Sequence, residues 1–286
     1  MKEQLSPPKP RTLRPVLAFF SAFLGLGVAF VYVGELRLAI ASVYSLYGLI
    51  ALSGWTGVMR SSAAGFWIVS VACAGIYLAS AILPAVMAYH DRHRVEKPYN
   101  RWWCYALWLL ATGLISLMAY KGRGEVFGYD LYRAPSVAMS PTIKRDDFFL
   151  VDAWRYHHHA PAAGEVVVLN LNDGTGTKYV KRIVGISGDR IELRDSVLIR
   201  NGQPVNEPYV HLVAPFPSYG RDYGPIVVGP NQVFVLGDYR DNSIDSRKWG
   251  TIPISQIQGR AQFVWLSLAE GHFQGSRIGI DLRPHE

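Results

Sequence analysis

The stretch "YRAPSVAMSPTIKRDDFFLVD", residues 132 to 152, runs from a loop into a strand. Pro135 and Pro141 exclude a continuous helix, and the apolar residues at 148 to 151 favour a β-strand. Three hydroxyl side chains lie in the loop, Ser136, Ser140 and Thr142. A reactive hydroxyl needs a base nearby, so a nucleophile here requires a base from another part of the chain.

The first 121 residues, upstream of this loop, are strongly apolar. They contain four nearly uncharged segments of 19 to 24 residues, at 15–33, 38–58, 66–89 and 102–120. Each is long enough to cross about 30 Å of hydrocarbon, and none shows the polar face of a soluble helix. We therefore expect residues 1–121 to form a helical membrane anchor.

The number of true crossings, three or four, stays open. The basic loop at 90–101 favours the cytoplasmic side, and so does the basic N-terminus. Four crossings would place these two segments on opposite sides. Three crossings would place both inside, with a re-entrant or interfacial piece near "GELRL" at 34–38, where Glu35 and Arg37 interrupt the apolar pattern.

Residues 122–286 predict a mostly antiparallel β domain, which follows a Gly-rich linker, "KGRGEVFGYD" at 121–130. Short β-prone runs alternate there with turn signals, such as Asn201-Gly202. The expected strands are 148–152, 165–171, 178–186, 189–193, 196–200 and 232–238. The predicted fold is thus transmembrane helices followed by a β domain.

Several classes of function are disfavoured. The formal charge of +7 lies largely beside the apolar segments, so membrane flanks explain it better than nucleic acid does. Cys73 and Cys104 fall inside apolar segments, which leaves no thiol for a zinc site in the β domain. The side chains of His157 to His159 would alternate faces in an extended chain, so they cannot all bind one metal ion, and we expect a surface loop there. We expect no metal and no cofactor.

Lys181 is the candidate base. It lies within "KYVKRIVGI", beside Val180, Ile183 and Val184. Burial among such residues lowers a lysine pKa from about 10.4 towards neutrality, and a neutral amine can accept a proton from a hydroxyl. The alternative is a strand lysine that points to solvent.

A dense turn, "LGDYRDNSIDSRKWG", occupies residues 236–250. Its acidic and basic side chains predict ion pairs that fix the loop; they are Asp238, Asp241, Asp245, Arg240, Arg247 and Lys248. Calcium binding is the alternative, but the alternating acidic ligands that end in a glutamate are missing.

Together the three pieces resemble bacterial type I signal peptidases, membrane-bound serine endopeptidases with a Ser-Lys dyad. The resemblance rests on four motifs in family order between residues 135 and 250: "PSVAMSPTI", "RDDFFLVD", "KRIVGISGD" and "GDYRDNSIDSR". It implies a role for individual residues. Lys181, followed by Arg182, falls on the general base, Ser243 on the serine that orients it, and Ser136 on an oxyanion-hole hydroxyl. Asp245 and Arg247 fall on a bracing ion pair.

Ala138 occupies the position of the family's nucleophilic serine. Three explanations are open: a Ser-to-Ala variant, a natural homologue that has lost catalysis, or attack by Ser136 or Ser140. Both serines lie two residues from Ala138, so in an extended segment all three share one face. The alternative function is a non-catalytic module that binds signal sequences or assists assembly in the membrane.

The resemblance also implies partners and a location. Substrates would be signal-sequence-bearing pre-proteins, with membrane lipid and the secretion machinery as further partners. The anchor would lie in the bacterial cytoplasmic (inner) membrane, with the β domain on the extracytoplasmic side. The apolar "APFPSYG", residues 214–220, reads as a loop that could touch lipid.

Overall fold

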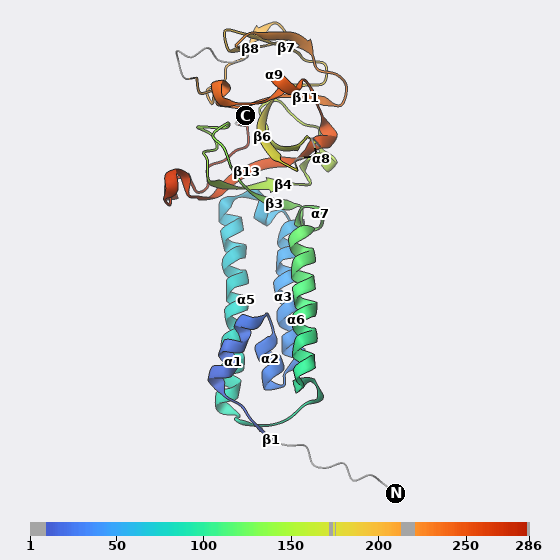
Figure 1. The fold of residues 1–286 in the computed structure, drawn as a ribbon, viewed down its shortest axis with the longest axis vertical. Coiled ribbons are helices and arrows are strands. Elements are labelled where there is room, and N and C mark those ends of the chain that lie inside the picture. Colours follow the sequence, from blue (N-terminus) through green and yellow to red (C-terminus); the bar gives the residue numbers. More distant parts are fainter. Residues whose placement is uncertain (1–9, 172–173, 175, 213–220, 285–286) are drawn as a thin grey trace. The chain divides into compact units, whose positions relative to one another are not determined.

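A computed structural model describes residues 10–171, 174, 176–212 and 221–284 (Figure 1). The chain forms two compact units. Unit 1 contains Met1–Gly57 and Trp67–Phe127, and unit 2 contains Val58–Phe66 and Gly128–Glu286. The expected loop at 214–220 lies outside the described residues.

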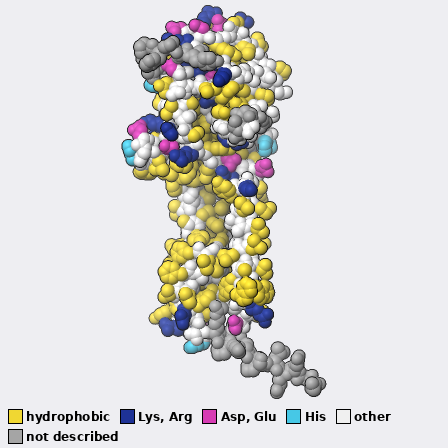
Figure 2. All heavy atoms as spheres, in the orientation of Figure 1, with side chains coloured by type: hydrophobic (Ala, Val, Ile, Leu, Met, Phe, Trp, Pro, Cys, Tyr) yellow, Lys and Arg dark blue, Asp and Glu magenta, His cyan; other side chains and the backbone are white. Residues whose placement is uncertain are grey.

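Three helices of unit 1 are long and apolar enough to cross a membrane: α3 (Leu36–Trp55), α5 (Ala63–His90) and α6 (Trp102–Lys121). Hydrophobic side chains cover much of the visible face of this unit (Figure 2). Short elements of the unit include β1 (Pro10–Thr12), β2 (His93–Val95), η2 (Pro98–Asn100) and α7 (Arg123–Phe127). The expected Gly-rich linker therefore contains a helical turn, α7, in place of a wholly irregular segment.

The first apolar segment, 15–33, is not one helix. It consists of α1 (Pro15–Ser21), η1 (Ala22–Leu24) and α2 (Val28–Val33), each too short to cross a bilayer. Gly27 has φ +80°, and a Cβ there would lie 2.8 Å from the Trp108 ring. Because glycine tolerates this conformation and this close approach, the chain reverses here. The Trp108 indole N–H donates to the freed Leu26 carbonyl at 2.8 Å.

Unit 2 is built on an antiparallel seven-stranded sheet of order β12-β11-β6-β5-β13-β4-β3. Its strands are β3 (Tyr129–Arg133), β4 (Asp147–Asp152), β5 (Val166–Asn170), β6 (Lys178–Ile186), β11 (Gln232–Leu236), β12 (Ile252–Pro253) and β13 (Ile257–Ser267). A four-stranded sheet of order β10-β7-β8-β9 accompanies it. It contains β7 (Arg190–Arg194), β8 (Val197–Arg200), β9 (Gln203–Pro204) and β10 (Tyr223–Val227).

This architecture confirms the predicted fold class, apolar helices followed by an antiparallel β domain. All six expected strands are present within about two residues of their expected ends. Asn201 and Gly202 have φ of 55° and 82° and connect β8 to β9, as the hairpin signal predicts.

The segment between α3 and α5 belongs to unit 2. It carries α4 (Val58–Ser61), and Arg60 forms an ion pair of 2.8 Å with Asp152 on β4. The Phe66 ring, 6 % exposed, lies 5.3 Å from the Trp265 ring on β13. A segment between two apolar helices of unit 1 therefore contributes to the core of the β unit.

The histidine run forms a helical turn, α8 (Arg155–His158), where the sequence predicts a loop. Between residues 10 and 284, leaving out the gaps given above, we find no group of three His, Cys, Asp or Glu side chains placed to hold a metal ion.

Strand β6 is central in its sheet and presents adjacent residues to opposite faces. Tyr179, Lys181 and Ile183 share one face, where Ile183 joins an apolar cluster with Val167 and Val235. Arg182 and Val184 share the other.

Candidate active site

Lys181 is a buried lysine at the candidate site. Its residue is 4 % exposed, it is paired in register with Val167 on β5, and its Nζ lies 6.0 Å from the Trp249 ring centroid. Burial lowers the pKa of the Lys181 ammonium to about 8, helped by the Arg247 charge and opposed by Asp245 and Asp238. The expected buried lysine is therefore present, and a substantial fraction of it is neutral in weakly basic solution.

Ala138 and Lys181 line one cleft of about 510 Å³. The other lining side chains that matter here are Ser136, Ser243 and Lys248. The Ala138 carbonyl accepts a hydrogen bond of 3.1 Å from the Tyr239 N–H, which fixes the loop at the cleft wall. The structure thus brings the nucleophile position and the candidate base to the same cleft.

The loop around Ala138 is a turn and not an extended segment. The Ser140 N–H donates to the Val137 carbonyl at 2.8 Å. Ser140 and Ala138 would share a face only in an extended chain, and residues 138–140 form a turn instead. Ser136 lines the cleft, whereas Ser140 is not among its lining residues in the described structure.

Ser243 lies in the cleft, but the hydrogen bond expected between it and Lys181 is not formed. The Ser243 Oγ is buried and has no hydrogen-bond partner among the described residues. Gly237 makes room for it: a Cβ on Gly237 would overlap the Ser243 side chain and lie 2.6 Å from the Ala138 carbonyl oxygen. Gly237 opens the motif "GDYRDNSIDSR", but the need for a glycine there follows only from the three-dimensional packing.

Asp245 and Arg247 form the expected ion pair inside the loop. The Arg247 Nε donates to Asp245 Oδ1 at 2.8 Å, and both side chains are buried. Asp245 also accepts from the Gly237 N–H at 3.1 Å, and Arg247 donates to the Arg240 carbonyl at 2.7 Å. The pair therefore fastens the loop to the strand end that carries Gly237.

On the opposite face of β6, Arg182 is the centre of a second network that the sequence did not reveal. Its guanidinium binds both carboxylate oxygens of Asp238, at 2.9 and 2.6 Å, and lies 3.8 Å from the Tyr209 ring centroid. Asp238 accepts a further hydrogen bond of 2.6 Å from the Thr142 hydroxyl. Three separate parts of the chain are thereby locked together directly behind Lys181.

A smaller pocket of about 210 Å³ adjoins the cleft. Its walls are mostly apolar and include Ala134, Met139, Ile143 and Val180, while Ser136 and Lys181 line both cavities. A small apolar group can therefore be held beside the Ala138–Lys181 pair.

Comparison with known proteins gives the family. The family model described as "Signal peptidase, peptidase S26" matches residues 105–266, more than half of the chain. The chain belongs to this signal peptidase family. The match covers the loop of Ala138, the strand of Lys181 and the turn of Ser243.

Similar proteins include a probable signal peptidase I-2 of Synechocystis, 37 % identical over 132 residues. The alignment covers 44 % of this chain and 58 % of the relative, so the chain spans little more than half the length of that protein. Signal peptidase I S of Bacillus subtilis is 32 % identical over 170 residues, which is 57 % of this chain and 90 % of the relative.

Among solved structures, a signal peptidase I from Enterococcus faecalis is 26 % identical. The superposition covers 36 % of this chain and 97 % of that structure, with a TM-score of 0.32.

Proposed function

We propose that this protein is a membrane-bound serine endopeptidase of the type I signal peptidase kind, which removes signal sequences from exported pre-proteins. The observation that carries the proposal is the shared cleft of residue 138 and a buried lysine whose pKa is about 8. Family membership supports it, and neither a metal nor a cofactor takes part in the proposed chemistry.

The proposed reaction needs a hydroxyl at position 138. Lys181 in its neutral form would take the hydroxyl proton while the oxygen attacks the scissile carbonyl. The backbone N–H of residue 138 and the Ser136 hydroxyl would hold the resulting oxyanion. The Lys181 ammonium would then give its proton to the leaving amine, and water activated by the same lysine would release the acyl group.

The chain as written carries Ala138, whose methyl group cannot attack a carbonyl. We propose that its cleft binds signal sequences and that cleavage requires serine at position 138. Ser136 lines the cleft and is the stronger of the two alternative nucleophiles, since Ser140 is not among the described lining residues. The same alanine favours the second candidate function, a binding module without peptidase activity.

The substrate would lie extended in the cleft beside residues 135–139. The pocket of about 210 Å³ suits a small apolar side chain, such as the alanines of the Ala-x-Ala pattern before cleavage sites. Tyr179, which lines both cavities, would separate this pocket from the 241–248 side of the cleft.

Three crossings, α3, α5 and α6, would place the basic loop 90–101 and the N-terminus on the cytoplasmic side. The segment 58–66 would then lie on the outer side together with unit 2, to which it belongs. We propose that orientation in a bacterial inner membrane, with the short helices α1 and α2 as a re-entrant piece. The secretion machinery would deliver the substrate.

The deciding experiment compares Ala138→Ser with the unchanged chain in proteoliposomes, with a pre-protein that carries an Ala-x-Ala site. We expect cleavage to appear or to rise by several orders of magnitude in Ala138→Ser, and Lys181→Met in that background to abolish it. Ser136→Ala and Ser140→Ala in the unchanged chain test the alternative nucleophiles. Binding of the pre-protein without cleavage in every variant would support the binding module instead.

A further inference from the structure

A further cavity lies in unit 1, far from the cleft along the sequence. Its volume is about 680 Å³. It contains the charged residues of "GELRL", which the proposed peptidase chemistry does not use. The polar side chains in its lining are Glu35, Arg37, Asp91, His93, Lys97 and Tyr99.

The cavity is formed where the short helix α2 turns back into α3. Gly34 ends α2 with φ +84°, and its carbonyl accepts a hydrogen bond of 2.6 Å from the Tyr99 hydroxyl. The Asn100 side chain donates to the Val31 carbonyl at 2.6 Å and accepts from the Lys97 N–H at 3.0 Å. These bonds, one buried and two partly buried, hold the 97–100 turn against the end of α2 and so fix the cavity wall.

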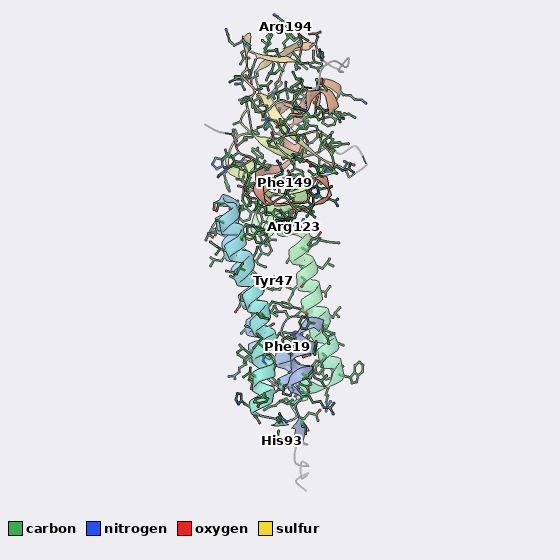
Figure 3. All side chains as sticks on the ribbon, turned by 90° about the vertical axis from the view of Figure 1, so that its left-hand side faces the viewer. Phe19, Tyr47, His93, Arg123, Phe149 and Arg194 are labelled. Carbon is green, nitrogen blue, oxygen red and sulfur yellow. The ribbon has the colours of Figure 1, made fainter. Side chains whose placement is uncertain are left out.

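The cavity is lined by two basic side chains and two carboxylates, and the two basic ones can meet an anion. Arg37 and Lys97 line it, and no ion pair of either is found within the part of the chain that the structure describes. Glu35 and Asp91 both already have interaction partners. His93, labelled in Figure 3, adds a ring N–H at this end of the unit.

Exposed aromatic rings indicate the depth at which the cavity would lie in a membrane. Tyr89 near the end of α5 is 62 % exposed and Trp102 at the start of α6 is 80 % exposed, and such rings prefer the headgroup region. Figure 2 shows Lys and Arg side chains gathered at this end of the unit. Leu38 and Ile40, which follow Arg37 on α3, are exposed apolar residues and offer a surface for acyl chains.

We infer that this cavity binds the phosphodiester of an anionic phospholipid, with Arg37 and Lys97 as its ligands. Arginine pairs with phosphate in a bidentate geometry, and lysine adds a second positive charge. The inference rests on the proposed insertion of unit 1 in a membrane and is independent of the proposed peptidase chemistry.

The test uses the full chain in nanodiscs of phosphatidylcholine with a minor share of phosphatidylglycerol. After release into detergent, native mass spectrometry counts the phosphatidylglycerol molecules that stay bound to the protein. We expect Arg37→Gln and Lys97→Gln each to lower retention about tenfold. Arg37→Lys should retain the lipid better than Arg37→Gln. Arg92→Gln is the matched control. Arg92 lies in the same loop as Lys97, but its guanidinium lies 5.6 Å from the Tyr89 ring centroid and it is not among the residues that line the cavity.

Equal loss of lipid in Arg92→Gln and Arg37→Gln would mean a diffuse basic surface and would overturn the site. Competition distinguishes the source of the phosphate: short-chain phosphatidylglycerol should displace the retained lipid, and inorganic phosphate at the same concentration should not. Equal displacement by inorganic phosphate would overturn the assignment to a lipid. A folded variant is recognised by an unchanged thermal unfolding midpoint, and Lys97→Gln provides an independent measurement if Arg37→Gln fails this check.

Discussion

At the level of single residues, the site depends on one lysine held among apolar neighbours. Tyr179 and Ile183 lie on the same face of β6 as Lys181, and Trp249 lies beside it. An ammonium in such surroundings loses hydration that nothing nearby fully replaces. The neutral amine is therefore favoured relative to free lysine, which is the property that a general base requires.

We expect the cleavage rate of Ala138→Ser to depend on the protonation of Lys181, whose pKa is about 8. The neutral form is the active one, so the rate should rise with pH up to this pKa and level off above it. Below it, each unit of pH should lower the rate about tenfold. Single-turnover rates across the range would show this, and pre-protein binding by the unchanged Ala138 chain is the control. A rate independent of pH below 8 would exclude Lys181 as the base.

Gly237 should tolerate no side chain. A Cβ there would overlap Ser243 and approach the Ala138 carbonyl oxygen to 2.6 Å, and both neighbours are held by the loop. We expect Gly237→Ala to lower the activity of Ala138→Ser by at least about tenfold and to lower its unfolding midpoint. Gly275→Ala is the matched control, since its Cβ would meet only the ring of exposed Phe273 at 3.3 Å. Unchanged activity in Gly237→Ala would show that the loop is not tightly fixed.

At the level of elements, the sequence predicted those strands that stand out as short β-prone runs between turn residues. The strand of Lys181 follows a regular pattern and was located with its correct ends, residues 178–186. The longest strand, β13, was missed because its pairing with β4 shifts register between Ala261 and Phe263 and again between Val264 and Leu266. Each shift breaks the two-residue period on which the prediction relies.

In the candidate site, too, the sequence predicts some features and not others. Ala138, Ser136, Lys181 and Ser243 were found from the motifs and do line one cleft. The network of Arg182, Asp238 and Tyr209 could not be found, because it joins residues far apart in the sequence and depends on which face of β6 the arginine occupies. Nor could a sequence pattern show that the Ser136–Ser140 loop turns.

We expect Arg182→Lys to destabilise unit 2 although it keeps the positive charge. Arg182 holds both oxygens of Asp238 and donates to the Gly164 carbonyl at 2.8 Å, and a lysine cannot replace all three bonds. The free energy of unfolding should fall by about 2 kcal/mol in urea titrations. Arg194→Lys is the control, because Arg194 also pairs with a carboxylate, that of Glu192, but on the surface. Equal effects of the two substitutions would mean that the buried network adds no stability.

At the level of the whole molecule, the apolar helical unit and the β unit are not consecutive in the sequence. The segment 58–66 lies between two apolar helices, yet it packs into unit 2 through Arg60 and Phe66. A unit 2 that begins at residue 122 lacks this segment. Its β13 and β4 would lose a buried aromatic ring and an ion pair with Asp152.

The corresponding prediction is that Phe66→Ala in the full chain weakens the β unit. Phe66 is 6 % exposed against Trp265 and Phe263, so truncation leaves a cavity that costs about 3 kcal/mol. Amide hydrogens of β13 that exchange through unfolding of the unit should then exchange about a hundredfold faster by mass spectrometry. Ile68→Ala is the matched control, because Ile68 is two residues further along α5 and 68 % exposed. The isolated residues 122–286 should exchange at least as fast as Phe66→Ala, because they lack the ring and also the ion pair of Arg60 with Asp152. If the isolated domain and Phe66→Ala instead protect β13 as well as the full chain does, the segment 58–66 only covers the sheet and contributes nothing to its stability.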